Sequence, residues 1–219
     1  MERRFEFDHV VLACKDLDSA AREMSELGLE AKTRLADHNW GTASLMVALD
    51  GCHLELLAID GDPPSASPTA ALVRKTLSEG RKLAAYCLRS RDMEGLRGEL
   101  LEIGVDAGEV MSKGTVISAG QVLNRPMLGL TWSLAHPWFP FFVGCTDAAA
   151  SANSAQAGEG RPLWRLAMVT VGSTDLKGSA AALQSITAES DLQLQVERHP
   201  CEAVVRIRLE RGSDSLELD

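Results

Sequence analysis

The apolar and polar positions of this chain repeat one pattern three times: a strand, an amphipathic helix and further strands. In the first copy, the apolar run at residues 10–13 predicts a strand, and Ala20 and Met24 follow at helical spacing. Asp50-Gly51 then joins two apolar, strand-like runs, and this dipeptide favours a tight hairpin turn. The chain therefore predicts repeated βαβββ units, a fold of the α+β class.

The breaks between the repeats divide the chain. The first unit is predicted over residues 5–60 and ends at a proline-rich connection, and the second spans residues 83–145. Together they form a predicted domain over residues 1–145. Residues 146–163 are rich in Ala, Ser and Gly, a composition typical of a linker. Residues 164–219 are the third predicted unit.

Composition narrows the classes of partner. Of the 219 residues, 45% are hydrophobic and the net charge is −9, which indicates a globular chain whose acidic surface disfavours nucleic acid. The five cysteines are scattered without a CxxC pair, which is typical of reduced thiols in a cytosolic protein. No apolar run approaches membrane-spanning length. We expect a cytoplasmic protein that binds neither nucleic acid nor membrane.

Three polar residues of the first unit fall on predicted strands. His9 lies in the first strand, and His53 and Glu55 lie in the last, where alternation places both on one face. If the two strands are neighbours, the three side chains form a set of two histidines and one carboxylate, a metal-binding arrangement. The alternatives are a hydrogen-bonded strand histidine for His9 and a solvated carboxylate for Glu55.

A set of short motifs relates the chain to a known superfamily. They are Asp8-His9-Val10-Val11-Leu12-Ala13, Trp40-Gly41-Thr42, Leu54-Glu55-Leu56-Leu57, Asn124-Arg125-Pro126, Trp132-Ser133-Leu134 and Pro140-Phe141-Phe142-Val143. In this respect the chain resembles the vicinal oxygen chelate superfamily, and specifically its glyoxalase-like branch. The resemblance implies that two βαβββ units curl into a cupped, mixed-sheet barrel around a divalent metal.

The resemblance also implies where ligands would stand, namely on the first and last strands of each unit. His9 and Glu55 match these positions in the first unit, with His53 as a further candidate. The corresponding residues in the second and third units are Ala85, Gly144, Met168 and Glu217. The expected metal site is therefore centred on the first unit.

Four further residues are candidates for substrate binding. Arg125 precedes a proline, and its guanidinium would hold a carboxylate or enediolate through two parallel contacts, unless it forms a surface ion pair. Trp40 and Trp132 would form apolar walls of the cavity, with burial in the core as the alternative. His38 would reach the mouth of the cavity or remain a solvent-exposed loop residue.

The resemblance implies a protein that acts on a small polar organic molecule in a sheet-lined cavity. As an enzyme it would be a metal-dependent lyase, isomerase or dioxygenase that uses Zn, Ni, Mn or Fe(II), with Glu55 as ligand or catalytic base. The alternative is a metal-free protein that sequesters a compound, as antibiotic-resistance members such as the bleomycin-resistance proteins do. The third unit has no fourth unit to pair with, so it packs on the barrel or, as the favoured alternative, forms a homodimer.

Overall fold

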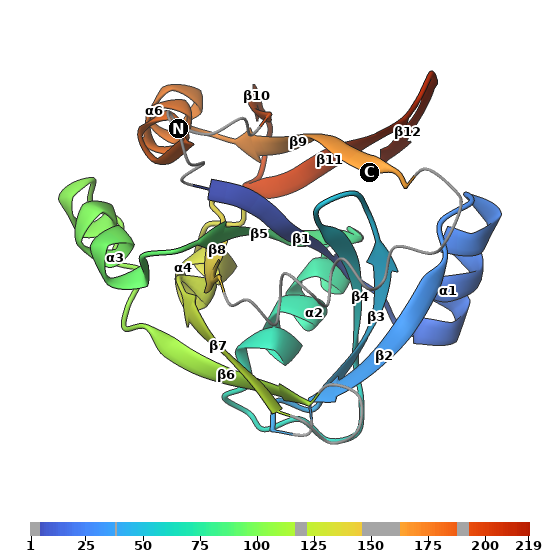
Figure 1. Ribbon diagram of the computed structural model, residues 1–219. Helices are drawn as coiled ribbons and strands as arrows, with labels where there is room; N and C mark the ends of the chain where they lie inside the picture. Colours follow the sequence, from blue (N-terminus) through green and yellow to red (C-terminus); the bar gives the residue numbers. More distant parts are fainter. Residues whose placement is uncertain (1–4, 38, 117–121, 146–162, 188–192) are drawn as a thin grey trace.

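Two β-sheets stacked on each other form the centre of the protein (Figure 1). The computed structural model describes residues 5–37, 39–116, 122–145, 163–187 and 193–219. The predicted linker at 146–163 therefore lies outside the described residues except for its last position. No helix within the described ranges is long and apolar enough to span a membrane.

The larger sheet contains eight strands from the first two predicted units. They are β1 (Phe5–Ala13), β2 (Ala31–Asp37), β3 (Thr42–Ala48), β4 (His53–Ile59), β5 (Leu83–Ser90), β6 (Met111–Val116), β7 (Val122–Leu128) and β8 (Phe141–Gly144). Their order across the sheet is β2-β3-β4-β1-β5-β8-β7-β6. Each unit pairs its first strand in parallel with its last, β1 with β4 and β5 with β8.

The two units join through the antiparallel pair β1–β5 at the middle of the sheet. The sheet curls so that its outer strands β2 and β6 approach each other without pairing, which leaves a cup rather than a closed barrel (Figure 1). This confirms the predicted α+β fold with a cupped mixed sheet. The β3–β4 hairpin turns at Gly51, whose positive φ of 78° is the conformation that Asp-Gly turns require.

Helices cover both faces of the cup. They are α1 (Leu17–Glu26), α2 (Pro68–Ser78), α3 (Met93–Glu102), α4 (Leu130–Ala135) and, in the third unit, α6 (Leu176–Thr187). The apolar sides of α1 and α3 pack on the convex face, and α2 and α4 pack on the concave face (Figure 1). The side chains of Asp16 and Asp92 cap α1 and α3, because each accepts a hydrogen bond from a first-turn N–H.

The third unit has the predicted order of elements but a different pairing. Its strands are β9 (Arg165–Ser173), β10 (Leu194–Arg198), β11 (Ala203–Arg211) and β12 (Asp214–Leu218), and they form a separate sheet in the order β10-β9-β11-β12. Here the opening strand lies between the second and third strands, not beside the last. Met168 on β9 and Glu217 on β12 are therefore separated by β11 and do not repeat the His9–Glu55 arrangement.

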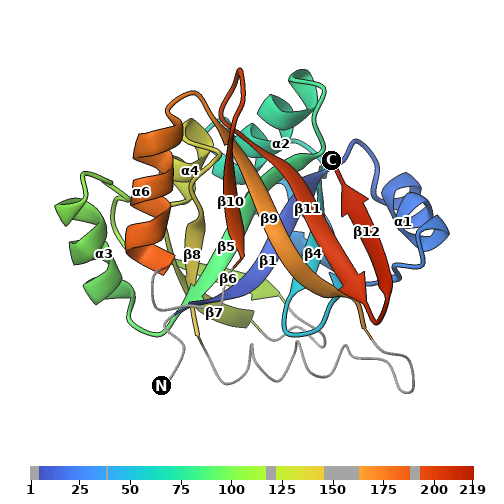
Figure 2. The same ribbon diagram turned by 90° about the horizontal axis from the view of Figure 1, so that it is seen from above.

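The smaller sheet lies across the convex face of the larger one, over β1 and β5 (Figure 2). Side chains from both sheets form one apolar core, which includes Val10, Leu12, Leu56, Leu88, Val169, Val171, Ile207 and Leu209. Of the two arrangements expected for the third unit, the structure shows packing on the barrel. The homodimer stays a prediction.

Candidate functional site

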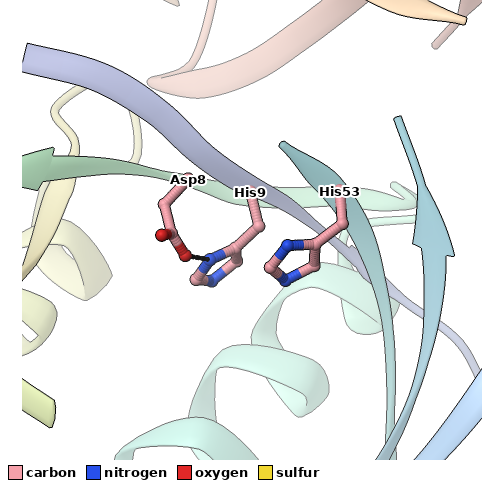
Figure 3. A group of neighbouring side chains, drawn as sticks. All are labelled: Asp8, His9 and His53. Atoms are coloured by element: carbon pink, nitrogen blue, oxygen red, sulfur yellow. Dashed lines mark hydrogen bonds and ion pairs between the residues drawn. The ribbon is translucent and has the colours of Figure 1, made fainter. Parts of the chain in front are cut away.

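A β-bulge in β1 places two adjacent polar side chains on the same side of the sheet. Phe7 pairs with Leu88 and His9 pairs with Cys87, so Asp8 is the extra residue on β1. A bulge interrupts the alternation of a strand and re-aims a side chain. Asp8 and His9 consequently point the same way, and His53 points with them (Figure 3). The concave side of the cup thus receives an acid and two histidines.

His9 and His53 are brought together by the parallel pairing of β1 and β4, in which they stand directly opposite each other. Their rings are stacked, with centroids 5.0 Å apart and 18° between the ring planes. Phe141 on β8 approaches His9 edge-on at 5.4 Å. His9 is 8% and His53 7% exposed, so both imidazoles lie in a mostly buried place.

Asp8 is fully buried and surrounded by three cationic or hydrogen-bonding groups. Its Oδ1 lies 2.8 Å from His9 Nδ1, Arg89 Nε donates to Oδ2 at 2.9 Å, and Arg125 donates from Nη1 and Nη2 at 3.2 and 2.7 Å. Burial alone would raise the pKa of Asp8, but the contacts with His9 and Arg125 outweigh it and hold this pKa well below its usual value. Asp8 is therefore an anion at neutral pH.

Glu55 completes the group from β4. Its Oε2 lies 3.4 Å from His9 Nε2, on the side of the ring away from Asp8, and its side chain is 16% exposed. His9 thus has a carboxylate beside each of its two nitrogens. The structure brings together the three residues proposed as metal ligands from the sequence, His9, His53 and Glu55.

His53 carries an unsatisfied nitrogen. Its Nδ1 is buried and has no hydrogen-bond partner, which is unusual because buried polar atoms are nearly always paired. Burial, and secondarily the neighbouring charge of His9, lowers the pKa of His53 from 6.5 to about 4. The ring is therefore neutral at neutral pH, and a neutral imidazole has a lone pair that can bind a metal.

One group of donors on the concave face lies close enough together to hold a divalent cation. Asp8, His9 and His53 offer ligand atoms that all lie within 4.8 Å of one another, the one such group among the described residues. Both oxygens of Asp8, however, already accept hydrogen bonds from guanidinium groups, which repel a cation. Glu55 is a further carboxylate beside the imidazoles, with its Oε2 3.4 Å from His9 Nε2.

The second unit does not repeat these ligands. Where the first unit pairs His9 with His53, the second pairs Cys87 with Phe141 on the equivalent strands β5 and β8. Ala85, the residue of the second unit expected at the position of His9, has no donor atom in its side chain. Gly144 cannot be replaced by a larger residue without strain, because a Cβ there would lie 2.9 Å from the Pro126 ring. Donor atoms are thus concentrated in the first unit.

The residues proposed for substrate binding are spread more widely. The guanidinium of Arg125 is bonded to Asp8, and Trp40 is partly buried beside the apolar cluster under α2. Trp132 lies on α4 rather than on a strand, and its ring is tilted by 33° against that of His136, with 4.4 Å between the centroids. His38 lies outside the described residues. Their contacts with a substrate stay predictions.

Two residues of the site were not identified from the sequence. Asp8 and Arg89 have no motif of their own, and Arg89 reaches the site from the second unit, on β5. The adjacent acid and histidine at the start of an apolar run are a signal, since two neighbouring polar residues break the alternation of a strand. The Arg89 contact depends on strand register, which the sequence alone does not provide.

The sequence matches the family model described as "Glyoxalase-like domain" over residues 7–203. The chain belongs to this family. Its cupped sheet of two βαβββ units is the vicinal oxygen chelate fold. A search of curated protein sequences found no significant match.

One solved structure shows the same architecture along nearly the whole chain. A hypothetical protein from Staphylococcus aureus superposes with a TM-score of 0.74 and 11% identity, over 96% of this chain and 92% of that one. The likeness therefore extends to the third unit. Methylmalonyl-CoA epimerases from Streptomyces coelicolor, in complex with 2-nitronate-propionyl-CoA, and from Mycobacterium tuberculosis match 66% of this chain and 96% and 91% of theirs. Their identities are 16% and 19%, each with a TM-score of 0.46.

Proposed function

We propose that this glyoxalase-like protein binds a divalent metal through His9, His53 and Glu55 and acts there on a small polar organic molecule. Zn, Ni, Mn and Fe(II) all accept two imidazoles and one carboxylate. Three protein ligands leave positions open for substrate oxygens, as a catalytic site needs. The reaction class is that of a metal-dependent lyase, isomerase or dioxygenase.

The observation that carries the proposal is the state of His53. A buried imidazole whose Nδ1 has no hydrogen-bond partner is unfavourable in the folded protein. A metal ion would supply the missing partner for the ring, and the low pKa keeps its lone pair available. The stacked ring of His9 and the carboxylate of Glu55 lie beside it.

The side chains have distinct roles in this proposal. A bound divalent ion would supply Lewis-acid stabilisation of negative charge on a substrate oxygen. His9 and His53 would hold the ion, and Phe141 packs edge-on against the His9 ring. Glu55, the most exposed of the three at 16%, would be the third ligand and is the residue best placed to accept a substrate proton.

A second candidate is a metal-free protein that binds and sequesters a small molecule on the same concave face. It is favoured by the second unit, in which the facing residues Cys87 on β5 and Phe141 on β8 supply no imidazole or carboxylate. It is favoured also by Arg89 and Arg125, because their positive charges lie close to the candidate metal ligands and would repel a cation.

Thermal melts of chelator-treated protein distinguish between the metal-dependent and the metal-free function. A metal that binds only the folded state stabilises it by about 2.7 kcal/mol at a hundredfold excess over its dissociation constant. We expect one of Zn, Ni, Mn or Fe(II) to raise the melting temperature of wild type and of Glu217→Gln, which alters an exposed acid on β12. Glu55→Gln should lose the increase. If no metal raises the wild-type midpoint, the metal-free function replaces the proposal.

A further inference from the structure

We propose that Asp8 is a positioning residue, which holds the His9 ring by accepting a hydrogen bond from its Nδ1, and that arginines of the second unit hold Asp8 in place. This rests on the proposed function for its consequence, since Nε2 is the atom that would bind the metal. The hydrogen-bond arrangement itself can be tested without any metal.

The donors and acceptors around Asp8 determine where the proton lies. An ionised carboxylate only accepts hydrogen bonds, and guanidinium groups only donate. Oδ1 receives Arg125 Nη1 and faces His9 Nδ1 at 2.8 Å, while Oδ2 receives Arg89 Nε and Arg125 Nη2. The short contact between Asp8 and His9 is therefore a hydrogen bond only if Nδ1 carries the proton. Nε2 lies on the other side of the ring, 3.4 Å from Glu55 Oε2.

The alternative role for Asp8 is that of a direct metal ligand, since its oxygen is close enough to the two imidazoles. Two guanidinium groups on the same carboxylate oppose this. A cation bound to Asp8 would meet the positive charges of Arg89 and Arg125 in a fully buried place, where water does not screen them. Outer partners of this kind orient a ligating histidine and fix its tautomer in many metal sites.

The arrangement gives the second unit a part in a site whose ligands it does not supply. Arg89 lies on β5 and Arg125 on β7, while Asp8 and His9 lie on β1. Arg89 is further anchored by Glu6 and by the carbonyl oxygen of Gly51 in the β3–β4 turn. The two units thus meet at Asp8, and the geometry of His9 depends on both.

The isosteric change Asp8→Asn reverses the hydrogen bond. The two arginines need an acceptor, so the amide oxygen of the new side chain should face them and its NH₂ group should face His9. An NH₂ group donates, and His9 Nδ1 must then accept, which moves the ring proton to Nε2. The matched control is Glu6→Gln, which removes the other carboxylate bonded to Arg89 and has no contact with His9 among the described interactions.

The experiment is ¹⁵N–¹H NMR of protein labelled on its histidine rings, with chelator present, in which His9→Gln identifies the His9 signals. We expect a proton on Nδ1 of His9 in wild type and Glu6→Gln, and no proton on Nδ1 in Asp8→Asn. Loss of an outer partner of this kind weakens metal binding about 10- to 100-fold, and we expect that loss in Asp8→Asn alone.

The wild-type spectrum is sufficient to overturn the inference, even if Asp8→Asn does not fold. An Nε2–H tautomer with no proton on Nδ1 would show that Asp8 does not accept a hydrogen bond from His9. An unchanged His9 signal and metal affinity in folded Asp8→Asn would do the same. The expected tautomers without binding of any metal would confirm the positioning role and reject the proposed function.

Discussion

The rings of His9 and His53 stack at 5.0 Å between centroids because the parallel strands β1 and β4 place the two residues opposite each other. The stacking has an electrostatic consequence. A proton on either ring disfavours a proton on the other, and burial penalises both charges. The pKa of His53 is lowered to about 4, so this ring is neutral at neutral pH, the state in which an imidazole can bind a metal ion.

The low pKa of His53 predicts a loss of stability in mild acid. His53 titrates near 6.5 in the unfolded chain and at about 4 in the folded one, so below pH 6.5 the unfolded state binds a proton that the folded state does not. The contribution is present above pH 6.5 and is lost as the pH falls toward 4, amounting to about 3 kcal/mol.

Urea melts of chelator-treated protein between pH 7 and pH 4 measure this slope. His53→Leu should flatten it, because the replacement has no group to titrate. Protonation of Asp8 should cause a further loss of stability at a lower pH, because the pKa of Asp8 is held below that of an ordinary Asp. This further loss should occur in both proteins. Equal slopes above pH 4 in wild type and variant would contradict the buried, neutral state of His53.

Removal of the Asp8 carboxylate should destabilise the fold strongly. Asp8→Ala leaves Arg89 and Arg125 without their shared anion, and loss of one partner from a buried ion pair costs about 3–5 kcal/mol. The matched change Asp16→Ala removes an exposed N-cap of α1 and should cost about 1 kcal/mol. Denaturant melts compare the two, and similar losses would show that the Asp8 cluster contributes little to stability.

The turn at Trp40-Gly41 should tolerate no side chain at residue 41. Gly41 has a φ of 62°, and a Cβ there would lie 2.3 Å from the Cα of Pro63. Gly51 has a similar φ of 78° with nothing within 4 Å, so Gly51→Ala should cost only the left-handed strain of about 1 kcal/mol. Gly41→Ala should cost clearly more in the same melts, and a smaller loss than for Gly51→Ala would contradict the close packing.

The stacking of the two sheets predicts that the third unit stabilises the cup. Ile207→Ala should lower the free energy of unfolding by about 2–5 kcal/mol, because it opens a cavity between the sheets. Met168→Ala is the control, since Met168 lies half-buried on the other face of β9. Hydrogen exchange should show β1 and β5 less protected in the Ile207 variant alone. Unchanged exchange there would mean that the sheets fold independently.

Much of the fold is predictable from local pattern. The apolar run of β1, the helical spacing of Ala20 and Met24, and the Asp50-Gly51 turn each specify their own element, and the repetition of the pattern indicates paired units. The order of strands in the third sheet is not predictable in this way, because it depends on contacts between strands that are distant in the sequence. The sequence order of βαβββ is the same, but β9 lies between β10 and β11 and packs on the outside of the cup.

Part of the candidate site is likewise predictable from the sequence, and part is not. Alternation places His53 and Glu55 on one face, and their convergence with His9 follows once β1 and β4 pair. Asp8 could not be placed, because its orientation depends on a bulge that alternation does not describe. The contact of Arg125 with Asp8 could not be predicted from the sequence either, since it joins two units and depends on the curvature of the whole sheet.

Metal content is the most direct test of the central claim, that His9, His53 and Glu55 form a metal site. Untagged protein would be dialysed against each of Zn, Ni, Mn and Fe(II), freed of loose ions and submitted to elemental analysis. The account predicts about one ion per chain for at least one metal in wild type and in Glu217→Gln, and almost none in Glu55→Gln or His53→Leu. Wild-type protein that retains no metal, or variants that retain as much as wild type, would contradict it.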